Sequence, residues 1–405
     1  MPLRRFHRTV ALASDARCYG RGVRALTVAV AFVLILCSVF PQAQAPARVQ
    51  FVFTSDAHYG ITRPQFRGRA NVNAHDVNAA MIAAINSLPA TTFPADAGVG
   101  ADEKAGAFDF VAQTGDIANR MELDRGKRIQ TAAASFAQFV GDYVGGLTLR
   151  TGAGSIAPVL MVPGNHDASN AAGFYRPMQP RRDPTAVIEI YNRMMAPAQP
   201  LTAKAFDYLR DRVHYSRDLG GAHFVFITIW PDSQERAWIE QDLSRVPATT
   251  PVLLFAHDQI EGEGKHFTNP VGRHDINATD RFENLLADEY QEGDVDRPSI
   301  EEARALEAFL RRHRNITAYF HGNSNWNEFY DYDGPSHSAP VHVFRVDSPM
   351  KGKYSNPDET KLSFQVATLD SQQGRLTVRE ALWNSRRAPA AVLWGSSTTV
   401  SVIPR

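Results

Sequence analysis

The chain has 405 residues, of which 44% are hydrophobic and 21% charged, a balance typical of a folded globular protein rather than a disordered one. Lys plus Arg and Asp plus Glu number 43 each, so the bulk charge predicts binding neither to nucleic acid nor to an anionic membrane surface. A chain of this length holds one large domain or two smaller ones.

Residues 1–47 have the composition of an export signal. Arginines precede an apolar stretch at residues 25–40, and small residues follow it. This order predicts a secretory signal peptide, and the apolar part is shorter than the roughly 20 residues that span a bilayer. Both cysteines, Cys18 and Cys37, lie in this segment, so the mature chain would form no disulfide. We expect a secreted or periplasmic protein without a stable membrane span after cleavage; a retained membrane anchor is the alternative.

From residue 49 onward, short apolar runs alternate with amphipathic segments. This alternation predicts an α/β layered fold with strands buried on both faces. Strands are expected at residues 49–54, 108–112, 159–162, 223–229, 252–256 and 316–320, and helices at 74–88, 129–144 and after two capping boxes, Asp232 with Glu235 and Ser299 with Glu302.

The helical signal disappears after residue 341. Strands are expected at 341–346, 362–369 and 376–383, where they would form or complete a second sheet. No linker rich in Gly, Ser or Pro divides the chain. We therefore expect a single domain over residues 48–385, followed by a C-terminal extension at 386–405.

Polar clusters follow four of the expected strands. They are Ser-Asp-Ala-His at 55–58, Gly-Asp at 115–116, Gly-Asn-His-Asp at 164–167, and His257. Each alone is more often a turn, a cap or a core histidine than a ligand. Open α/β sheets, however, build their sites outside the carboxyl ends of their strands, so the joint occurrence of these clusters indicates a metal site.

These motifs, in this order, resemble the calcineurin-like metallophosphoesterases, a superfamily that includes purple acid phosphatase-like enzymes and phosphodiesterases. The resemblance extends from residue 49 to about residue 383. It implies a four-layer α/β/β/α sandwich, in which two mixed sheets are flanked by helices. It also implies a centre of two divalent metal ions, with Mn, Fe, Zn, Mg or Ca as the candidates.

The resemblance assigns roles to five ligands. Asp56 and His58 are expected at the first metal, and Asp116 is expected to bridge the two ions. Asn165, through its amide oxygen, and His257 are expected at the second metal. Carboxylate, amide oxygen and imidazole are the donor types that such ions take.

The resemblance also implies a catalytic histidine and contacts to the substrate. His166 is expected to protonate the leaving oxygen, with Asp167 fixing the orientation of its ring. Asn119 and His321 are expected to contact the substrate.

The last motif of the family, Gly-His-x-His, is changed in this chain. Gly322 is present, but Asn323 and Asn325 replace the two histidines. In one account both asparagines bind through their amide oxygens, which favours Mn²⁺, Mg²⁺ or Ca²⁺ over metals that prefer nitrogen. In the second, other histidines replace the missing ones; in the third, the site has decayed and binds one metal or none. The histidines considered in the second account are His75, His266, His274, His321 and His337.

The function implied is that of an exported metal-dependent phosphoesterase. It would hydrolyse phosphate mono- or diesters, of small molecules or lipids, by attack of a metal-bridging hydroxide. The alternative is a non-catalytic or single-metal degenerate member of the family that binds a metal or a phosphorylated ligand. Arg63, Arg67 and Arg69 follow the first motif, and we interpret them as a solvated basic loop rather than an anion site.

Overall fold

The computed structural model describes residues 48–119, 123–124, 127–128, 130–168, 183–276, 281–385 and 392–405. The predicted signal peptide lies outside these described residues, as do both cysteines. Within the described part of the chain, no helix combines the length and the apolar content needed to cross a membrane.

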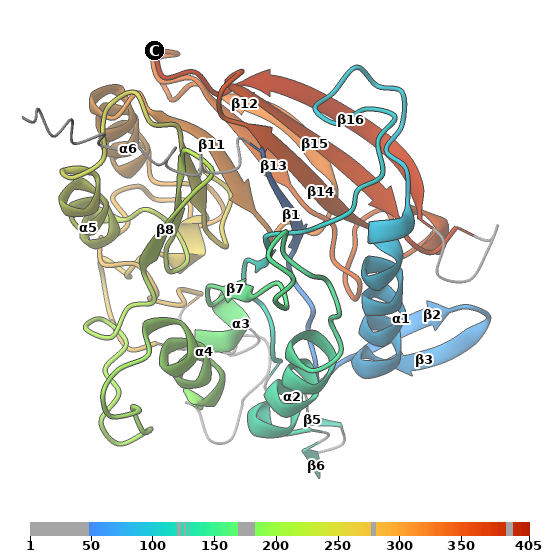
Figure 1. Ribbon diagram of the computed structural model, residues 1–405. Coiled ribbons are helices and arrows are strands. Elements are labelled where there is room, and N and C mark those ends of the chain that lie inside the picture. The colour runs from blue at the N-terminus through green and yellow to red at the C-terminus, as the bar shows by residue number, and fades with distance from the viewer. Residues whose placement is uncertain are drawn as a thin grey trace, which may run out of the picture. The chain divides into compact units, whose positions relative to one another are not determined.

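Two six-stranded mixed sheets form the centre of the described fold (Figure 1). In the first sheet β1, β4 and β7 run parallel, and β14, β15 and β16 are added antiparallel. In the second sheet β9, β10, β11 and β13 run parallel, with β8 and β12 as antiparallel edges. The first sheet comprises, in spatial order, β16 (Leu393–Ser401), β15 (Arg375–Leu382), β14 (Ser363–Asp370), β1 (Arg48–Thr54), β4 (Phe110–Gln113) and β7 (Val159–Met161). The second comprises β12 (Glu328–Tyr332), β13 (Val341–Arg345), β11 (Ile316–His321), β10 (Val252–Phe255), β9 (Ala222–Phe226) and β8 (Tyr215–Leu219).

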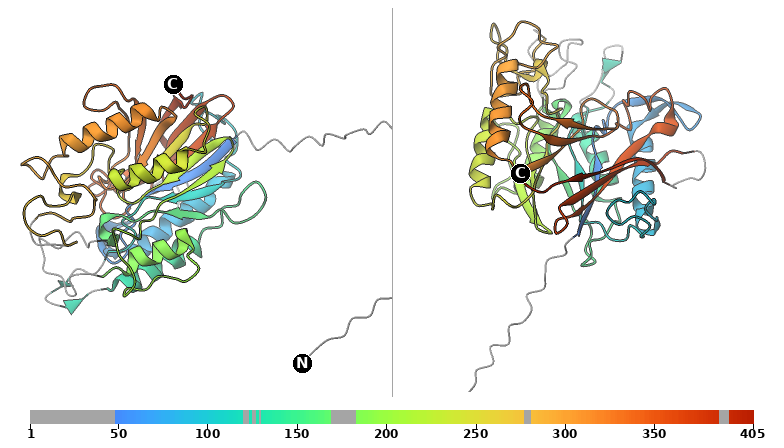
Figure 2. Two further views of the ribbon diagram at one scale, coloured as in Figure 1. Left: turned by 90° about the vertical axis from the view of Figure 1, so that its left-hand side faces the viewer. Right: turned by 90° about the horizontal axis from the view of Figure 1, so that it is seen from above.

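Helices cover the outer faces of both sheets. α5 and α6 pack on the second sheet, where apolar side chains such as Ile239 and Leu306 join a core cluster with Leu254 of β10. α1 and α2 pack on the first sheet, and Figure 2 shows α1 on the opposite side from α5 and α6. This arrangement confirms the predicted α/β/β/α sandwich. The helices are α1 (Ala74–Ser87), α2 (Ala132–Phe139), α3 (Asn165–Ala168), α4 (Thr185–Met195), α5 (Ser233–Leu243) and α6 (Ile300–Arg312).

A cluster of phenylalanines joins the two sheets. On β10, Leu253 and Phe255 belong to the core between the sheets, whereas Val252 and Leu254 face the helices, as the period-two alternation of a strand requires. Phe255 stacks on Phe320 with ring centroids 4.7 Å apart and meets Phe51 of the first sheet edge-on at 5.7 Å. Aromatic packing of this kind fixes the two sheets face to face.

Several predicted elements differ in detail. The helix expected at 129–144 is α2 followed by a π-helical turn, η2 (Val140–Val144). The Asp232 side chain caps α5 by accepting a hydrogen bond from the N–H of Glu235 at 2.9 Å, as predicted. The Ser299 side chain makes no capping hydrogen bond, so that capping box was wrong.

The C-terminal extension is part of the sheet rather than an addition to the domain. Strand β16 pairs antiparallel with β15 from Arg375 opposite Ser401 to Leu382 opposite Leu393. The boundary predicted at residue 385 would therefore cut through one sheet. The hairpin of β2 (Thr62–Phe66) and β3 (Arg69–Asn73) was not predicted, because its apolar residues are too few to show a period. Helix α4 was also not predicted, although Ala186, Val187, Ile188 and Ile190 form its buried face.

Replacing Phe255 by Ala tests the core between the sheets. We expect the free energy of unfolding to fall by about 3–5 kcal/mol, because the side chain is fully buried and its loss leaves a cavity. Chemical denaturation measures the effect. Val271→Ala is the control, since Val271 is 81% exposed and should change stability by less than about 0.5 kcal/mol. Equal effects of the two variants would contradict this account of the core.

Candidate metal centre

The loops that follow β1, β4, β10 and β11 are bonded to one another through their backbones. The N–H of Asp56 donates to the carbonyl of Gly115 at 2.9 Å, and the N–H of His58 donates to that of Asp116 at 2.8 Å. The N–H of Gly322 donates to the carbonyl of His257 at 3.0 Å. These bonds join the loops in two pairs, and the N–H of Asn323 links the pairs by donating to Oδ2 of Asp56 at 2.9 Å. The four loops thus meet at the carboxyl ends of the parallel strands, where such sheets build their sites.

Several side chains of the site extend from backbone in the left-handed region. Their φ values range from +46° to +63°, a conformation that residues other than Gly seldom adopt. Such strain persists where surrounding contacts hold it, and it concentrates at functional sites. The residues are Asp56, His58, Asp116, Asn323 and Asn325.

Two glycines allow the loops to approach. A Cβ on Gly164 would lie 2.2 Å from the backbone nitrogen of Asp116 and 2.3 Å from its Oδ1. A Cβ on Gly322 would lie 2.2 Å from Oδ2 of Asp56. All three separations are shorter than real Cβ contacts, so only glycine admits this packing around the two carboxylates.

Two groups of potential ligands share Asp116. One comprises His58, Asp116 and His166, and the other Asp56, Asp116 and His257; within each, the ligand atoms lie within 4.8 Å of one another. Oδ2 of Asp116 lies 3.6 Å from Nε2 of His58, and its Oδ1 lies 3.3 Å from Nε2 of His257. The Asp116 carboxylate therefore stands between the two groups, as the predicted bridging role requires.

The second group is extended by Asn165 at the start of α3. Its Oδ1 lies 3.1 Å from Nε2 of His257, and its Nδ2 donates to Oε2 of Glu283 at 3.2 Å. The bond to Glu283 leaves the amide oxygen facing His257. The structure thus brings together Asn165 and His257, the two residues that were predicted to bind the second ion.

Three buried polar atoms of the site lack hydrogen-bond partners among the described residues, as expected of atoms that bind a cation. Oδ1 of Asp56, Nε2 of His58 and Oδ1 of Asn325 are buried and have no hydrogen-bond partner among the described residues. Buried polar atoms are normally paired, and all three are good donors to a metal. The unpaired atoms of Asp56 and His58 lie 3.6 Å apart, so the first predicted metal position fits a divalent cation.

Hydrogen bonds behind the ligands fix the rings of two histidines. Nδ1 of His58 bonds to Oδ1 of Asn119 at 2.6 Å, and Nδ1 of His257 bonds to the carbonyl of Thr114 at 2.7 Å. A proton held on Nδ1 leaves the Nε2 lone pair for a metal. Asn119 was predicted to contact the substrate, but in the structure its amide oxygen holds the ring of His58.

The electrostatics of the centre favour a cation. Burial alone would raise the pKa of Asp56, but His58 and His257 lower it below its ordinary value. Burial opposes the protonation of His257, yet Asp116 and Asp56 outweigh it and raise the pKa of His257 to about 9. The two buried carboxylates therefore attract positive charge, here a proton that a metal ion would displace.

The predicted pairing of His166 with Asp167 is not formed. The Asp167 carboxylate accepts hydrogen bonds from the backbone N–H groups of Gly164, Ile117 and Ala118 at 2.8–3.1 Å. Nδ1 of His166 is buried and finds no partner in the described part of the chain. Asp167 thus ties two loops together instead of orienting the ring, while Nε2 of His166 lies 3.8 Å from Oδ2 of Asp116.

The substrate role predicted for His321 is also wrong. Its side chain is fully buried, with Nδ1 bonded to the carbonyl of Gly322 at 2.9 Å and Nε2 to the hydroxyl of Tyr330 at 3.2 Å. Both ring nitrogens are used, so His321 is a core histidine. Burial lowers its pKa well below the ordinary value, which keeps the ring neutral.

The asparagines of the last motif differ from each other. Asn323 donates its backbone N–H to Oδ2 of Asp56 at 2.9 Å and its Nδ2 to Oε1 of Gln259 at 3.2 Å. Asn325 donates its Nδ2 to the carbonyl of Asn323 at 2.6 Å, which leaves its Oδ1 free for a cation. None of the proposed replacement histidines belongs to either ligand group of the described residues.

Two residues near the centre were missed from the sequence. Glu283 bonds to Asn165, as described above, and Nζ of Lys351 lies 3.0 Å from Nε2 of His166. Neither belongs to a motif. Lys351 follows β13, so the rule that sites lie beyond the carboxyl ends of parallel strands would have found it, had the direction of that strand been readable from the sequence.

Comparison with known proteins was made at the levels of sequence and fold. The sequence model of a family described as Calcineurin-like phosphoesterase matches residues 49–322, and no curated protein matches the chain. A solved dimetal phosphatase from Danio rerio is 12% identical, with 87% of this chain and 99% of that one covered and a TM-score of 0.46. Vps29 structures from Entamoeba histolytica and Chaetomium thermophilum are 10% and 7% identical, cover 87% of this chain and 99% and 95% of their own, and have TM-scores of 0.29. The matched segment contains all five ligands that follow β1, β4, β7 and β10 and ends immediately before Asn323.

Substituting Gly164 by Ala tests the close approach of the loops. We expect a loss of about 1–3 kcal/mol of stability, because the added methyl group overlaps Asp116. The stabilisation by Mn²⁺, about 2.7 kcal/mol at 100 times its Kd, should also disappear. Thermal unfolding with and without Mn²⁺ measures both. Gly152→Ala is the matched control, since a Cβ there meets nothing within 4 Å; a Gly164 variant that still responds to Mn²⁺ like this control would refute the packing argument.

Proposed function

Because this chain belongs to the calcineurin-like phosphoesterase family, we propose that it hydrolyses phosphate esters with divalent cations held at the metal centre. The observation that carries the proposal is the Asp116 carboxylate, which is shared between two groups of potential ligands. Divalent cations bound there would acidify water and stabilise the charge on the phosphoryl oxygens. Phosphate ester hydrolysis needs both effects at neutral pH.

The residues around the centre have separate tasks in this proposal. Although Asp56 groups with His257 around Asp116, its Oδ1 also lies 3.6 Å from Nε2 of His58. Asp56, His58 and Asn325 would therefore hold one cation with Asp116, and Asn165 and His257 would hold the other. His166 would move a proton at Nε2, the ring atom that lies nearest Asp116. Burial, followed by the charge of Lys351, lowers the pKa of His166 well below its ordinary value, which keeps the ring neutral and leaves Nε2 able to accept a proton.

The donor set favours hard cations. Two carboxylates and two amide oxygens outnumber the imidazoles of His58 and His257. Oxygen donors of this kind suit Mn²⁺, Mg²⁺ or Ca²⁺ better than Zn²⁺. We therefore propose a preference for Mn²⁺ or Mg²⁺ over Zn²⁺.

A second candidate function follows from Asn323. Its Nδ2 donates to Oε1 of Gln259 at 3.2 Å, so its amide is already engaged by a neighbouring side chain. A chain that holds one cation and binds a phosphorylated ligand without cleaving it would explain this geometry. Turnover measurements separate this candidate from the enzyme.

We also propose that the protein is exported, with residues 1–47 removed. The arginines, the apolar stretch and the small residues of that segment support this proposal. Mass spectrometry of the N-terminus of the secreted or periplasmic form tests it. An intact N-terminus in the membrane fraction would indicate the retained anchor instead.

Turnover of aryl phosphate mono- and diesters tests the enzymatic proposal. Metal-stripped protein resupplied with Mn²⁺, Fe²⁺, Zn²⁺, Mg²⁺ or Ca²⁺ should regain activity, most with Mn²⁺ or Mg²⁺. Asp116→Asn should lower kcat by about 100-fold or more, because it removes the shared charge while Asn tolerates the left-handed backbone at this position.

The matched control for that loss is Asp331→Asn, whose side chain is 72% exposed on the edge strand β12. It should keep full activity. Folded wild-type protein that turns over neither class of ester with any metal would favour the binding protein.

Restoring the histidines tests the role of the last motif. The double variant Asn323→His/Asn325→His should bind Zn²⁺ at least about tenfold more tightly, because imidazole nitrogen suits zinc better than an amide oxygen. Competition against a zinc chelator measures the affinity. Asn327→His, two residues further along the chain, is the control and should leave zinc affinity unchanged; an unchanged affinity in the double variant would show that these positions do not face the ions.

A further inference from the structure

Lys351 reaches the metal centre from a loop that belongs to no motif. The loop follows β13, which runs parallel to β11 in the second sheet, so it emerges at the same edge as the ligands. Nζ of Lys351 lies 3.0 Å from Nε2 of His166. That ring atom lies 3.8 Å from Oδ2 of Asp116, so Nε2 of His166 contacts both the ammonium group and the shared carboxylate.

The position of this loop is fixed by the centre itself. The hydroxyl of Ser348 donates to the carbonyl of Asp56 at 2.8 Å. The same oxygen accepts the backbone N–H of Lys351 at 2.9 Å and that of Met350 at 3.2 Å. Lys351 is thus connected through one hydroxyl to a residue that holds the first cation.

A buried arginine holds the loop from the other side. Arg63 is fully buried and donates to the carbonyls of Pro349, at 2.9 Å, and of Ser355. The interpretation of Arg63 as part of a solvated basic loop was therefore wrong. Ser348 and Arg63 thus fix the backbone of the loop on two sides. A fixed backbone of this kind preorganises Lys351 as a binding group.

The contact between Lys351 and His166 determines which atom carries the proton. An ammonium group has donors and no acceptor, so Nε2 of His166 is the acceptor in this bond. A substrate oxygen that enters between Asp116 and His166 would meet the N–H groups of Lys351 first. The lysine then exchanges a bond to imidazole for a charge-assisted bond to an anion, which is the stronger interaction.

We propose that Lys351 binds the phosphoryl group of the substrate and that its charge selects dianionic phosphomonoesters over monoanionic diesters. This inference rests on the proposed function and names its substrate class. A monoester carries one more negative charge than a diester. In a buried site, a fixed ammonium group therefore stabilises the bound monoester more than the bound diester.

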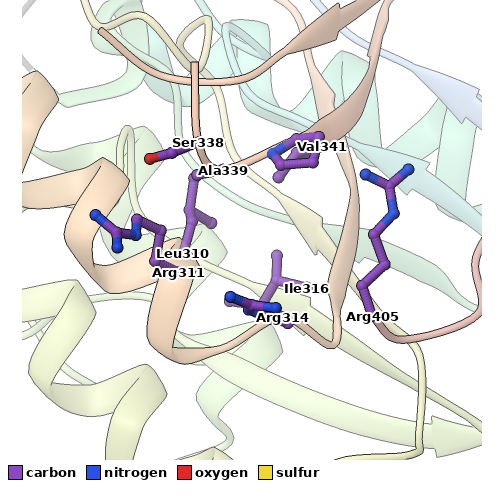
Figure 3. A pocket seen from close by; sticks show the side chains of 9 residues that line it. Leu310, Arg311, Arg314, Ile316, Ser338, Ala339, Val341 and Arg405 are labelled. Carbon is purple, nitrogen blue, oxygen red and sulfur yellow. The ribbon is translucent and has the colours of Figure 1, made fainter. Parts of the chain in front are cut away.

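A second cationic group offers the competing site for an anion. Arg311, Arg314 and Arg405 line a cavity of about 170 Å³ (Figure 3). It lies where β11 and β13 begin, next to Ile316 and Val341, and so at the opposite end of these strands from the metal centre. These arginines are exposed, and the described residues that line their cavity include no member of either ligand group, so they serve as the control for nonspecific phosphate binding.

Binding of orthophosphate to the Mn²⁺-loaded protein, measured by calorimetry, is the first test. Lys351→Met should weaken it about 10- to 100-fold, the range for a hydrogen bond to a charged group, and Lys351→Arg should recover part of the loss. The metal content and the melting temperature should stay unchanged. Lys353→Met is the matched control, because its ammonium lies over the rings of Trp326 and Tyr354.

Steady-state kinetics provide the second test. Lys351→Met should lower kcat/KM for an aryl phosphomonoester about 30-fold or more, and for the corresponding diester less than about 5-fold. Equal losses for the two esters, or phosphate binding equal to that of Lys353→Met, would overturn the proposal. So would loss of phosphate binding in Arg311→Gln/Arg314→Gln but not in Lys351→Met. A protein that binds phosphate through Lys351 without turning over either ester would refute the enzymatic function and leave the assignment of Lys351 intact.

Discussion

The buried carboxylates of Asp56 and Asp116 impose the constraint on which the rest of the centre depends. Both side chains are removed from water, and each buried charge costs several kcal/mol unless it is paired or hydrogen-bonded. Backbone N–H groups of Asn323 and His166 supply part of the compensation. The left-handed turns and the closely packed glycines position these N–H donors next to the carboxylates. They position the imidazoles of His58 and His257 there as well. The negative charge that these contacts leave uncompensated favours the binding of cations.

The elements and ligands that the sequence revealed are those with a local signature. Short, mostly apolar segments marked the strands β1, β4 and β10, and a polar cluster at each strand end marked the ligands. The roles of Asp167, Asn119 and His321 could not be read in the same way. Each depends on which atom of a distant segment comes within 3 Å, and a motif carries no information about that. Lys351 was missed for a related reason. In the sequence β13 resembles the antiparallel strands that follow it, and only its pairing with β11 shows that it runs parallel to that strand.

The asparagines of the last motif are less disruptive than the loss of two histidines suggests. Both occupy left-handed backbone, a conformation in which asparagine is among the most readily accepted residues. The turn that carries them can thus form without strain that the side chains must offset. What changes is the donor atom, from imidazole nitrogen to amide oxygen at Asn325, and to a hydrogen bond with Gln259 at Asn323. The fold of the motif and its coordination chemistry are therefore separable properties.

The pairing of β1 with β14 has a consequence for the order in which the protein is assembled. Arg48 lies opposite Asp370 in this ladder, and the loop of Lys351 docks on the carbonyl of Asp56. Contacts between segments so distant form late, because loop closure must precede them. The centre is therefore incomplete until almost the whole polypeptide has been synthesised. If the chain is exported as we propose and folds only afterwards, the ion that occupies the centre is selected by the supply outside the cell membrane and not by the pool in the cytoplasm.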